Sequence, residues 1–328
     1  MDLTPNDFED LVGAYALDAC EPHEAEAMER YLAANHDARV EVERLREVAA
    51  GIGAAGASRP PVALRERLMH AAGDRVTAAA PDVALQRETD RFDEFLNTLD
   101  ETDLEVVTEN GLTVRELVQH VEVVDRALVD SADDPAGAFI GADEVAVITE
   151  HDLVGRVDEP FAETAARFRR TRRRLTDLHG RLPADQRIAG YGRDDTLVIR
   201  AFETWTHLED SERALGRAPT RPDAAVMRTM ADLAMKSLPL ALAVSGMAHP
   251  GATARFVLDG AGGGEWSIAC APGEPASANA DVVVRASVVD WCRRFADRIA
   301  PDELPATVDG DADLAHDLIA AANTFAGL

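Results

Sequence analysis

Apolar residues recur at helical spacing, every three or four positions, through most of the chain. Residues 1–57 carry three short apolar stripes, and residues 82–220 carry four longer ones. Four such helices in one stretch bury their stripes most simply as an antiparallel bundle. We therefore predict a small N-terminal helical domain followed by a four-helix bundle.

The second of the four bundle helices has the clearest start. Thr113 is followed three residues later by Glu116, which is the capping-box pattern. Its apolar stripe comprises Val114, Leu117, Val118, Val121, Val124 and Leu128. The third helix is expected over residues 159–179 and the fourth over residues 196–215, where Gly216 provides a C-terminal stop.

The pattern changes after residue 225. One more helix is expected over residues 225–244, and residues 253–259, 266–270 and 281–285 then alternate with period 2, as β-strands do. Residues 260–264 read as a turn, and Ser287 and Asp311 are good N-caps for two closing helices. This segment predicts an α+β domain with a small sheet.

Small and turn-forming residues suggest where one domain ends and the next begins. Residues 51–61 are rich in glycine and end in two prolines, so we expect a break there, followed by a short helix over residues 63–79. The predicted domains are residues 1–80, 82–220 and 225–328. The predicted fold class is mainly α, with a C-terminal α+β domain.

Composition narrows the class of protein. A formal net charge of −27 and a pI of about 4.6 argue against a nucleic-acid-binding surface, which needs a basic patch. No apolar run approaches the roughly 20 residues of a membrane-spanning helix, and the acidic start is unlike a secretory signal. Cys20, Cys270 and Cys292 are scattered, as in reduced proteins. We expect a cytoplasmic protein without membrane partners.

Three polar residues fall where the bundle helices should face inward. His120 lies three positions after Leu117 and four before Val124, and Glu203 and His207 share one helix face. Two imidazoles and one carboxylate suit a divalent metal, with one coordination position left open and Asp210 placed to support a ligand. Zinc fits this set, as do nickel, cobalt, iron and manganese. By spacing alone, a Glu–His pair on a helix is usually a solvated or capping pair, and a lone inward histidine is more often a hydrogen-bonded core residue.

The residues around these positions resemble a known family. The segments are Thr113-Val-Arg-Glu-Leu-Val-Gln-His120, Arg200-Ala-Phe-Glu-Thr-Trp-Thr-His207-Leu-Glu-Asp210 and Ala214-Leu-Gly216. They are similar to the mycothiol-dependent maleylpyruvate isomerase family, a branch of the DinB-like metal-binding bundles. The resemblance implies zinc ligands at His120, Glu203 and His207, and mycothiol as the thiol cosubstrate.

The C-terminal segment resembles that family's sterol-carrier-like second domain. The resemblance rests on Asp290-Trp-Cys-Arg-Arg-Phe-Ala-Asp-Arg298, followed by Val308-Asp-Gly-Asp311 and a final helix. It implies a catalytic arginine near this point, for which Arg298 is the best match and Arg294 the alternative. Either arginine is equally typical of a protein surface.

The N-terminal segment resembles a different family, the zinc-binding anti-sigma domains of actinobacteria. The resemblance rests on residues 11–35, which begin Leu-Val-Gly-Ala-Tyr-Ala-Leu-Asp-Ala-Cys. The family's zinc ligands fall on Tyr31, Asn35 and Ala38, none of which binds zinc, and Cys20, His23 and His36 do not rebuild the site by spacing. We interpret the segment as a degenerate, metal-free version of that domain.

Three functions are consistent with these patterns. The first is a metal-dependent, mycothiol-dependent isomerase or S-transferase that acts on a small electrophilic substrate. The second is an anti-sigma-type regulator, in which the N-terminal domain binds a sigma factor and the bundle senses a metal or thiol. The third is a stable metal-binding bundle without catalysis.

Overall fold

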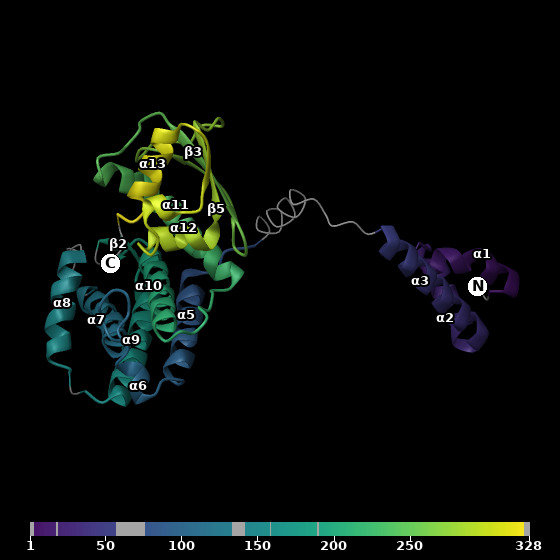
Figure 1. The fold of residues 1–328 in the computed structure, drawn as a ribbon, viewed down its shortest axis with the longest axis horizontal. Coiled ribbons are helices and arrows are strands. Elements are labelled where there is room, and N and C mark those ends of the chain that lie inside the picture. The colour runs from purple at the N-terminus through teal and green to yellow at the C-terminus, as the bar shows by residue number, and fades with distance from the viewer. Residues whose placement is uncertain are drawn as a thin grey trace. The chain divides into compact units, whose positions relative to one another are not determined.

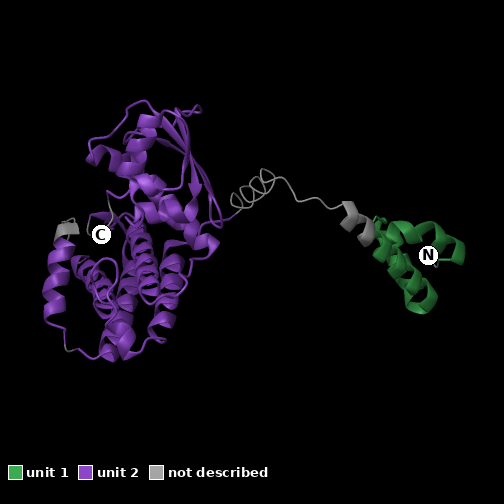
Figure 2. Cartoon of the chain, viewed as in Figure 1, with its two compact units in different colours: residues 1–64 green, residues 65–328 purple. Residues whose placement is uncertain are grey.

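The computed structural model describes residues 3–17, 19–56, 76–132, 142–157, 159–188 and 190–324. The chain forms two compact units, residues 1–64 and 65–328 (Figure 2). The helix expected over residues 63–79 lies outside the described residues up to residue 75, and residues 76–79 are not helical.

The first unit contains the helices α1 (Pro5–Ala16), α2 (Pro22–Ala34) and α3 (His36–Gly56). Its small core is formed by Leu32, Ala38 and Val42, with Phe8 and Tyr31 stacked at its edge. Helix α3 extends to Gly56, so the first part of the expected break is helical. The helix continues because a glycine weakens a helix by about 1 kcal/mol without ending it, and the first proline of the expected break is at residue 60.

The second unit begins with a helical bundle (Figure 1). Its long helices are α5 (Pro81–Leu96), α7 (Val114–Ser131), α9 (Phe161–Arg181) and α10 (Arg193–Ala214). Helix α10 packs against α5 and α7, and α9 packs against the same two helices, so the four close a ring. Thr113 and Glu116 form the predicted capping box at the start of α7. The predicted four-helix core is therefore present.

Smaller elements that the sequence pattern did not predict decorate the bundle. They are α6 (Glu101–Leu104), α8 (Ala142–Val154) and a hairpin of β1 (Arg187–Ile188) with β2 (Tyr191–Gly192). Helix α8 packs on α7. Its apolar residues are divided between the inside and the solvent, since Val145 is buried whereas Val147 and Val154 are exposed. Because the apolar residues of α8 do not gather on one face, the sequence shows no helical periodicity there.

The C-terminal part combines three described α-helices with a small mixed sheet. Its elements are α11 (Ala224–Val244), β3 (Thr253–Asp259), β4 (Gly264–Ala269), β5 (Val282–Ser287), α12 (Val288–Phe295), the 3-10 turn η1 (Pro301–Glu303), β6 (Thr307–Gly310) and α13 (Ala312–Ala321). The strand order is β4-β3-β5-β6, with β3 parallel to β5 and the other pairs antiparallel. This confirms the expected fold class, mainly helical with a small α+β region.

Helix α11 joins the bundle to the sheet. It contacts α5 and α10 on one side and β4, α12 and α13 on the other. One continuous apolar core runs from Trp205 of α10 through Met230 of α11 to Phe256 of β3 and Trp291 of α12. Gly262 fits the β3–β4 turn against α11, because its φ is +88° and a Cβ there would lie 2.5 Å from the carbonyl oxygen of Ala224. The bundle and the sheet are thus packed against each other. None of the described helices has the length and apolarity to cross a membrane.

Candidate metal centre

Helix α7 places His120 at the inner face of the bundle. The capping box fixes where the helix starts, and Leu117 and Val124, one turn to either side of His120, are buried. Nδ1 of His120 lies 3.0 Å from Oγ1 of Thr149, which belongs to α8. His120 is therefore held between its own helix and a neighbour that the sequence pattern did not reveal.

Helix α10 supplies the other two residues of the set. Glu203 and His207 lie one turn apart, and the helix is anchored by the buried side chains of Trp205, which lies between them in the sequence, and Leu208, which follows them. The side chain of His207 is only 6% exposed. A polar pair this deep in a bundle requires a partner, because an unpaired buried polar group costs free energy.

The structure brings His120, Glu203 and His207 together. One ligand atom from each lies within 4.8 Å of the others, and this is the one such cluster of three histidine, cysteine or acidic side chains found among the described residues. The imidazole rings of the two histidines are perpendicular, with centroids 5.1 Å apart.

An orphaned nitrogen marks the centre of this cluster. Nε2 of His207 lies 3.1 Å from a carboxylate oxygen of Glu203, yet this contact lacks hydrogen-bond geometry, and neither ring nitrogen of His207 has a hydrogen-bond partner among the described residues. Such a buried nitrogen between a second imidazole and a carboxylate fits a divalent metal ion.

The pKa shifts in the cluster keep two residues in the protonation state that a metal ligand needs. Burial, with His207 acting in the same direction, lowers the pKa of His120 to about 3, so its imidazole is neutral near pH 7. Burial opposes ionisation of Glu203, but His207, Arg200 and Arg298 outweigh it and lower the pKa of Glu203 to about 2. Burial also lowers the pKa of His207, and the carboxylates of Asp210 and Glu203 reverse this and raise it.

Asp210 and Arg298 form a second layer behind His207. Oδ2 of Asp210 lies 3.3 Å from Nδ1 of His207, and Nη2 of Arg298 donates a 2.8 Å hydrogen bond to the same oxygen. Asp297 adopts φ +59° at the end of α12, and the amide of Arg298 bonds the carbonyl of Arg293, which is the Schellman pattern. This helix ending turns Arg298 toward the bundle.

Arg294, the alternative catalytic arginine, lies elsewhere. Its side chain is 1% exposed and donates to the carbonyl oxygens of Ile319, Ile299 and Ala320. It therefore ties α12 to the C-terminal helix. Of the two candidates, Arg298 is the one that reaches the metal-ligand set through Asp210.

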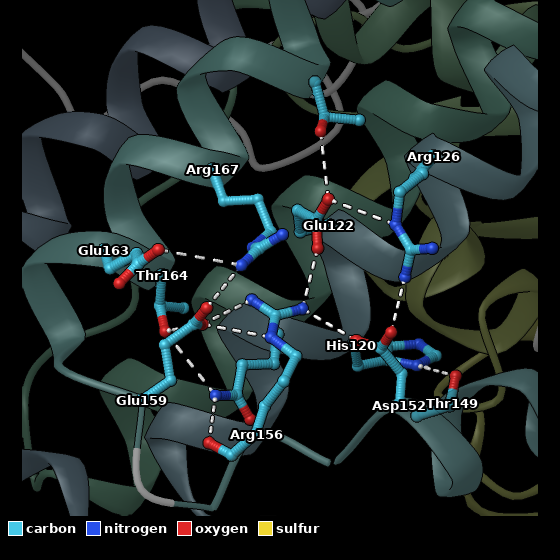
Figure 3. Close-up of polar contacts among 12 residues, drawn as sticks. His120, Glu122, Arg126, Thr149, Asp152, Arg156, Glu159, Glu163, Thr164 and Arg167 are labelled. Atoms are coloured by element: carbon cyan, nitrogen blue, oxygen red, sulfur yellow. Dashed lines mark hydrogen bonds and ion pairs between the residues drawn. The ribbon is translucent and has the colours of Figure 1, made fainter.

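A buried ionic network braces the helices next to His120. Figure 3 shows Glu122 of α7 between Arg126 and Arg156, with Asp152 of α8 close by. Nη1 of Arg156 lies 2.8 Å from both carboxylates, and Arg126 reaches Asp152 at 2.6 Å. Because these contacts join α7 and α8, they fix the position of Thr149 relative to His120. Sequence reasoning missed all of them, since α8 carried no periodic signal.

A cavity of about 520 Å³ opens beside Glu203. It lies between α10, the β1–β2 hairpin, α11 and the end of α12. Most of its lining is apolar, with Phe202 and Phe295 in its wall and Arg187 and Lys236 among its polar residues. A pocket of this size beside the candidate ligands can admit a small organic molecule. Its lining comes from distant segments, so the sequence could not reveal it.

Comparisons with known proteins find one family model and two solved structures that are similar to parts of the chain. Residues 85–212 match the family model described as "Mycothiol maleylpyruvate isomerase N-terminal domain". This range contains His120, Glu203 and His207. Two crystal structures of the mycothiol-dependent maleylpyruvate isomerase, one of them of a mutant, are similar at 17% identity, with a TM-score of 0.46. The alignment covers 69% of this chain and 91% of theirs. A search of curated proteins finds no significant match.

Proposed function

From the match of residues 85–212 to the mycothiol maleylpyruvate isomerase N-terminal domain model, we propose that the protein is a metal-dependent enzyme that uses mycothiol. It would act on a small electrophilic substrate, as an isomerase or as an S-transferase. The observation that carries the proposal is the convergence of His120, Glu203 and His207 inside the matched domain. The resemblance of residues 11–35 to anti-sigma domains is a separate prediction.

The donor set supports a catalytic rather than a purely structural metal. Neutral His120, ionised Glu203 and His207 would hold a divalent ion with three protein ligands, which leaves a coordination position open. Zinc fits best, although the other divalent ions of the first transition row fit as well. A bound divalent ion would lower the pKa of a thiol at the open position, so that thiolate is available near neutral pH.

The protein's own groups would orient the ligands. Arg298 fixes Asp210, and Asp210 in turn lies against Nδ1 of His207, which leaves Nε2 facing Glu203. Arg298 therefore acts in this proposal as a positioning residue. The thiolate sulfur would form a bond to an electrophilic carbon of the substrate. In an isomerase that bond breaks again after rotation, and in a transferase it remains in the product.

The first experiment measures bound metal by mass spectrometry in protein purified without a histidine tag. We expect about one equivalent in the parent and little in His207→Ala, because the variant loses a buried ligand. His249→Ala is the matched control, since His249 pairs with Asp317 in the C-terminal part and lies outside the cluster. A parent that is empty and does not take up added zinc would contradict the proposal. Consumption of mycothiol with an electrophile is the next assay.

A further inference from the structure

The cavity beside Glu203 has a mostly apolar lining, which the metal site does not explain. Its walls are formed largely by Ile199, Phe202, Leu233, Leu240 and Phe295. Leu240 is 52% exposed at this pocket, although leucine is usually buried. A polyhydroxylated thiol such as mycothiol would place hydroxyl groups against this surface without partners, which costs free energy. The wall therefore suits the other reactant, one with an apolar body.

Cationic side chains stand at the same cavity. Lys236, the only lysine in the chain, contacts both carboxylate oxygens of Asp195 at 2.7 Å, so these two charges offset each other. Arg187 donates to the carbonyl oxygen of Gly190 and pairs with no carboxylate among the described residues. Glu203 also lines the cavity but belongs to the proposed ligand set. The rest of the lining carries two cations, Arg187 and Lys236, and one carboxylate, Asp195, in a chain whose net charge is −27. One excess cation matches one anionic group.

We propose that this cavity binds an amphipathic monoanion, with its apolar body along the Phe202–Phe295 wall and its anionic group at Arg187 and Lys236. Its far end would then lie at Glu203, beside the ligand set. That this molecule is the electrophilic substrate rests on the proposed function, whereas its binding does not. A small dicarboxylate is a poorer match, because it has two charges and little apolar surface.

The direct test is calorimetric titration of the full-length, metal-loaded protein with three probes. Decanoate has the required shape and charge, decyltrimethylammonium has the same chain with the opposite charge, and maleate is a small dianion. We expect decanoate to bind at least about tenfold more tightly than either of the others, which is about 1.4 kcal/mol. Equal or tighter binding of the cation or of maleate would overturn the assignment.

Two variants locate the site. Arg187→Gln should weaken decanoate binding about tenfold, whereas Arg181→Gln should leave it unchanged. Arg181 is a matched control because it is also exposed, also donates to a backbone carbonyl, and does not line the cavity. Ser237→Trp should fill the cavity and abolish binding. Equal effects of the two arginine substitutions would place decanoate elsewhere.

The single lysine provides a readout that needs no variant. Lys236 has a side chain 65% exposed, so amine acetylation followed by mass spectrometry reports its accessibility. Decanoate should slow this acetylation and decyltrimethylammonium should not; unchanged acetylation at saturating decanoate would contradict the proposal. If decanoate binds but no metal or thiol transfer is found, the cavity assignment stands and the proposed function fails. If thiol transfer is found and decanoate does not bind, only the cavity assignment fails.

Discussion

His120 is held by a hydroxyl group on a different helix. Oγ1 of Thr149 lies 3.0 Å from Nδ1 of His120, so the other ring nitrogen is left for a metal. Partners of this kind fix the tautomer and the ring orientation of a ligand histidine, and their loss commonly weakens metal binding by about 10- to 100-fold. Thr149 is thus a positioning residue for the proposed centre.

Thr149→Ala should therefore weaken zinc binding by about tenfold, because the imidazole of His120 is freed to rotate. Competition against a chromophoric chelator measures the affinity, and the visible spectrum of the cobalt-substituted protein reports the ligand geometry. Thr149→Ser keeps the hydroxyl and should restore both. An alanine variant with the parent's affinity and cobalt spectrum would show that the contact is incidental.

Glu88 of α5 gives a pH-dependent prediction. Its side chain is 0% exposed, and burial raises its pKa to about 7 despite the opposing effect of Arg91. The folded state therefore holds a proton that the unfolded chain releases near pH 4.5, so this group's contribution to stability falls as pH rises from about 4.5 to 7.

Glu88→Gln removes this titration. Relative to the variant, the parent should lose about 2 kcal/mol of unfolding free energy between pH 5.5 and pH 8, a range above the pI where solubility is better. Urea unfolding followed by circular dichroism measures the difference. A parent–variant difference that does not change with pH would contradict the prediction.

At the scale of elements, a capping box stabilises the start of the helix that carries His120. Oγ1 of Thr113 accepts a hydrogen bond from the amide of Glu116, and the carboxylate of Glu116 accepts one from the amide of Thr113. Within the helix, the 3.6-residue repeat places His120 on the same face as Leu117 and Val124, which are buried. The cap therefore stabilises the helix that presents His120 to the cluster.

Thr113→Ala should lower the free energy of unfolding by about 1 kcal/mol, because the amide of Glu116 loses its acceptor and the carboxylate of Glu116 loses the hydroxyl that donates to it. Thr113→Ser keeps the oxygen and should recover most of the loss. Chemical unfolding monitored by circular dichroism measures both. Identical midpoints for the parent and the alanine variant would indicate that neighbouring contacts alone set the start of α7.

At the scale of the whole molecule, the residues of the proposed site all belong to the second unit. The described residues of this unit begin at residue 76, and Ala79 is bonded to the start of α11. The amide of Ala79 donates to the carbonyl of Ala225, and Oγ1 of Thr229 donates to the carbonyl of Ala79. A chain that begins at residue 76 retains these contacts.

Residues 76–328 should accordingly bind one equivalent of metal and transfer thiol as fast as the full chain does. Metal analysis and the thiol-transfer assay on the two proteins, prepared alike, measure this. Loss of metal or of activity in the shorter protein would show that the first unit contributes to the site. Capture of a sigma factor by the full chain but not by residues 76–328 would support the regulatory role predicted for the N-terminal domain.

The sequence by itself determined most of the regular structure. Helical spacing and the Thr113–Glu116 pair located α7, and the N-caps Ser287 and Asp311 located α12 and α13. These signals are local, because hydrogen bonds within three or four residues fix them. Spacing placed His120, Glu203 and His207 on inner faces but left other interpretations open, and the family resemblance singled them out.

Only the tertiary structure decided which side chains meet. It placed Arg298 against Asp210 and Arg294 against the carbonyl oxygen of Ile299, brought Thr149 to His120, and formed the cavity from α10, α11, α12 and the β1–β2 hairpin. No periodicity reveals these contacts, because their members lie tens of residues apart and meet through packing. The local sequence determines the residue types and the helix face on which each residue lies. The distances between the side chains of the site depend on how the helices pack.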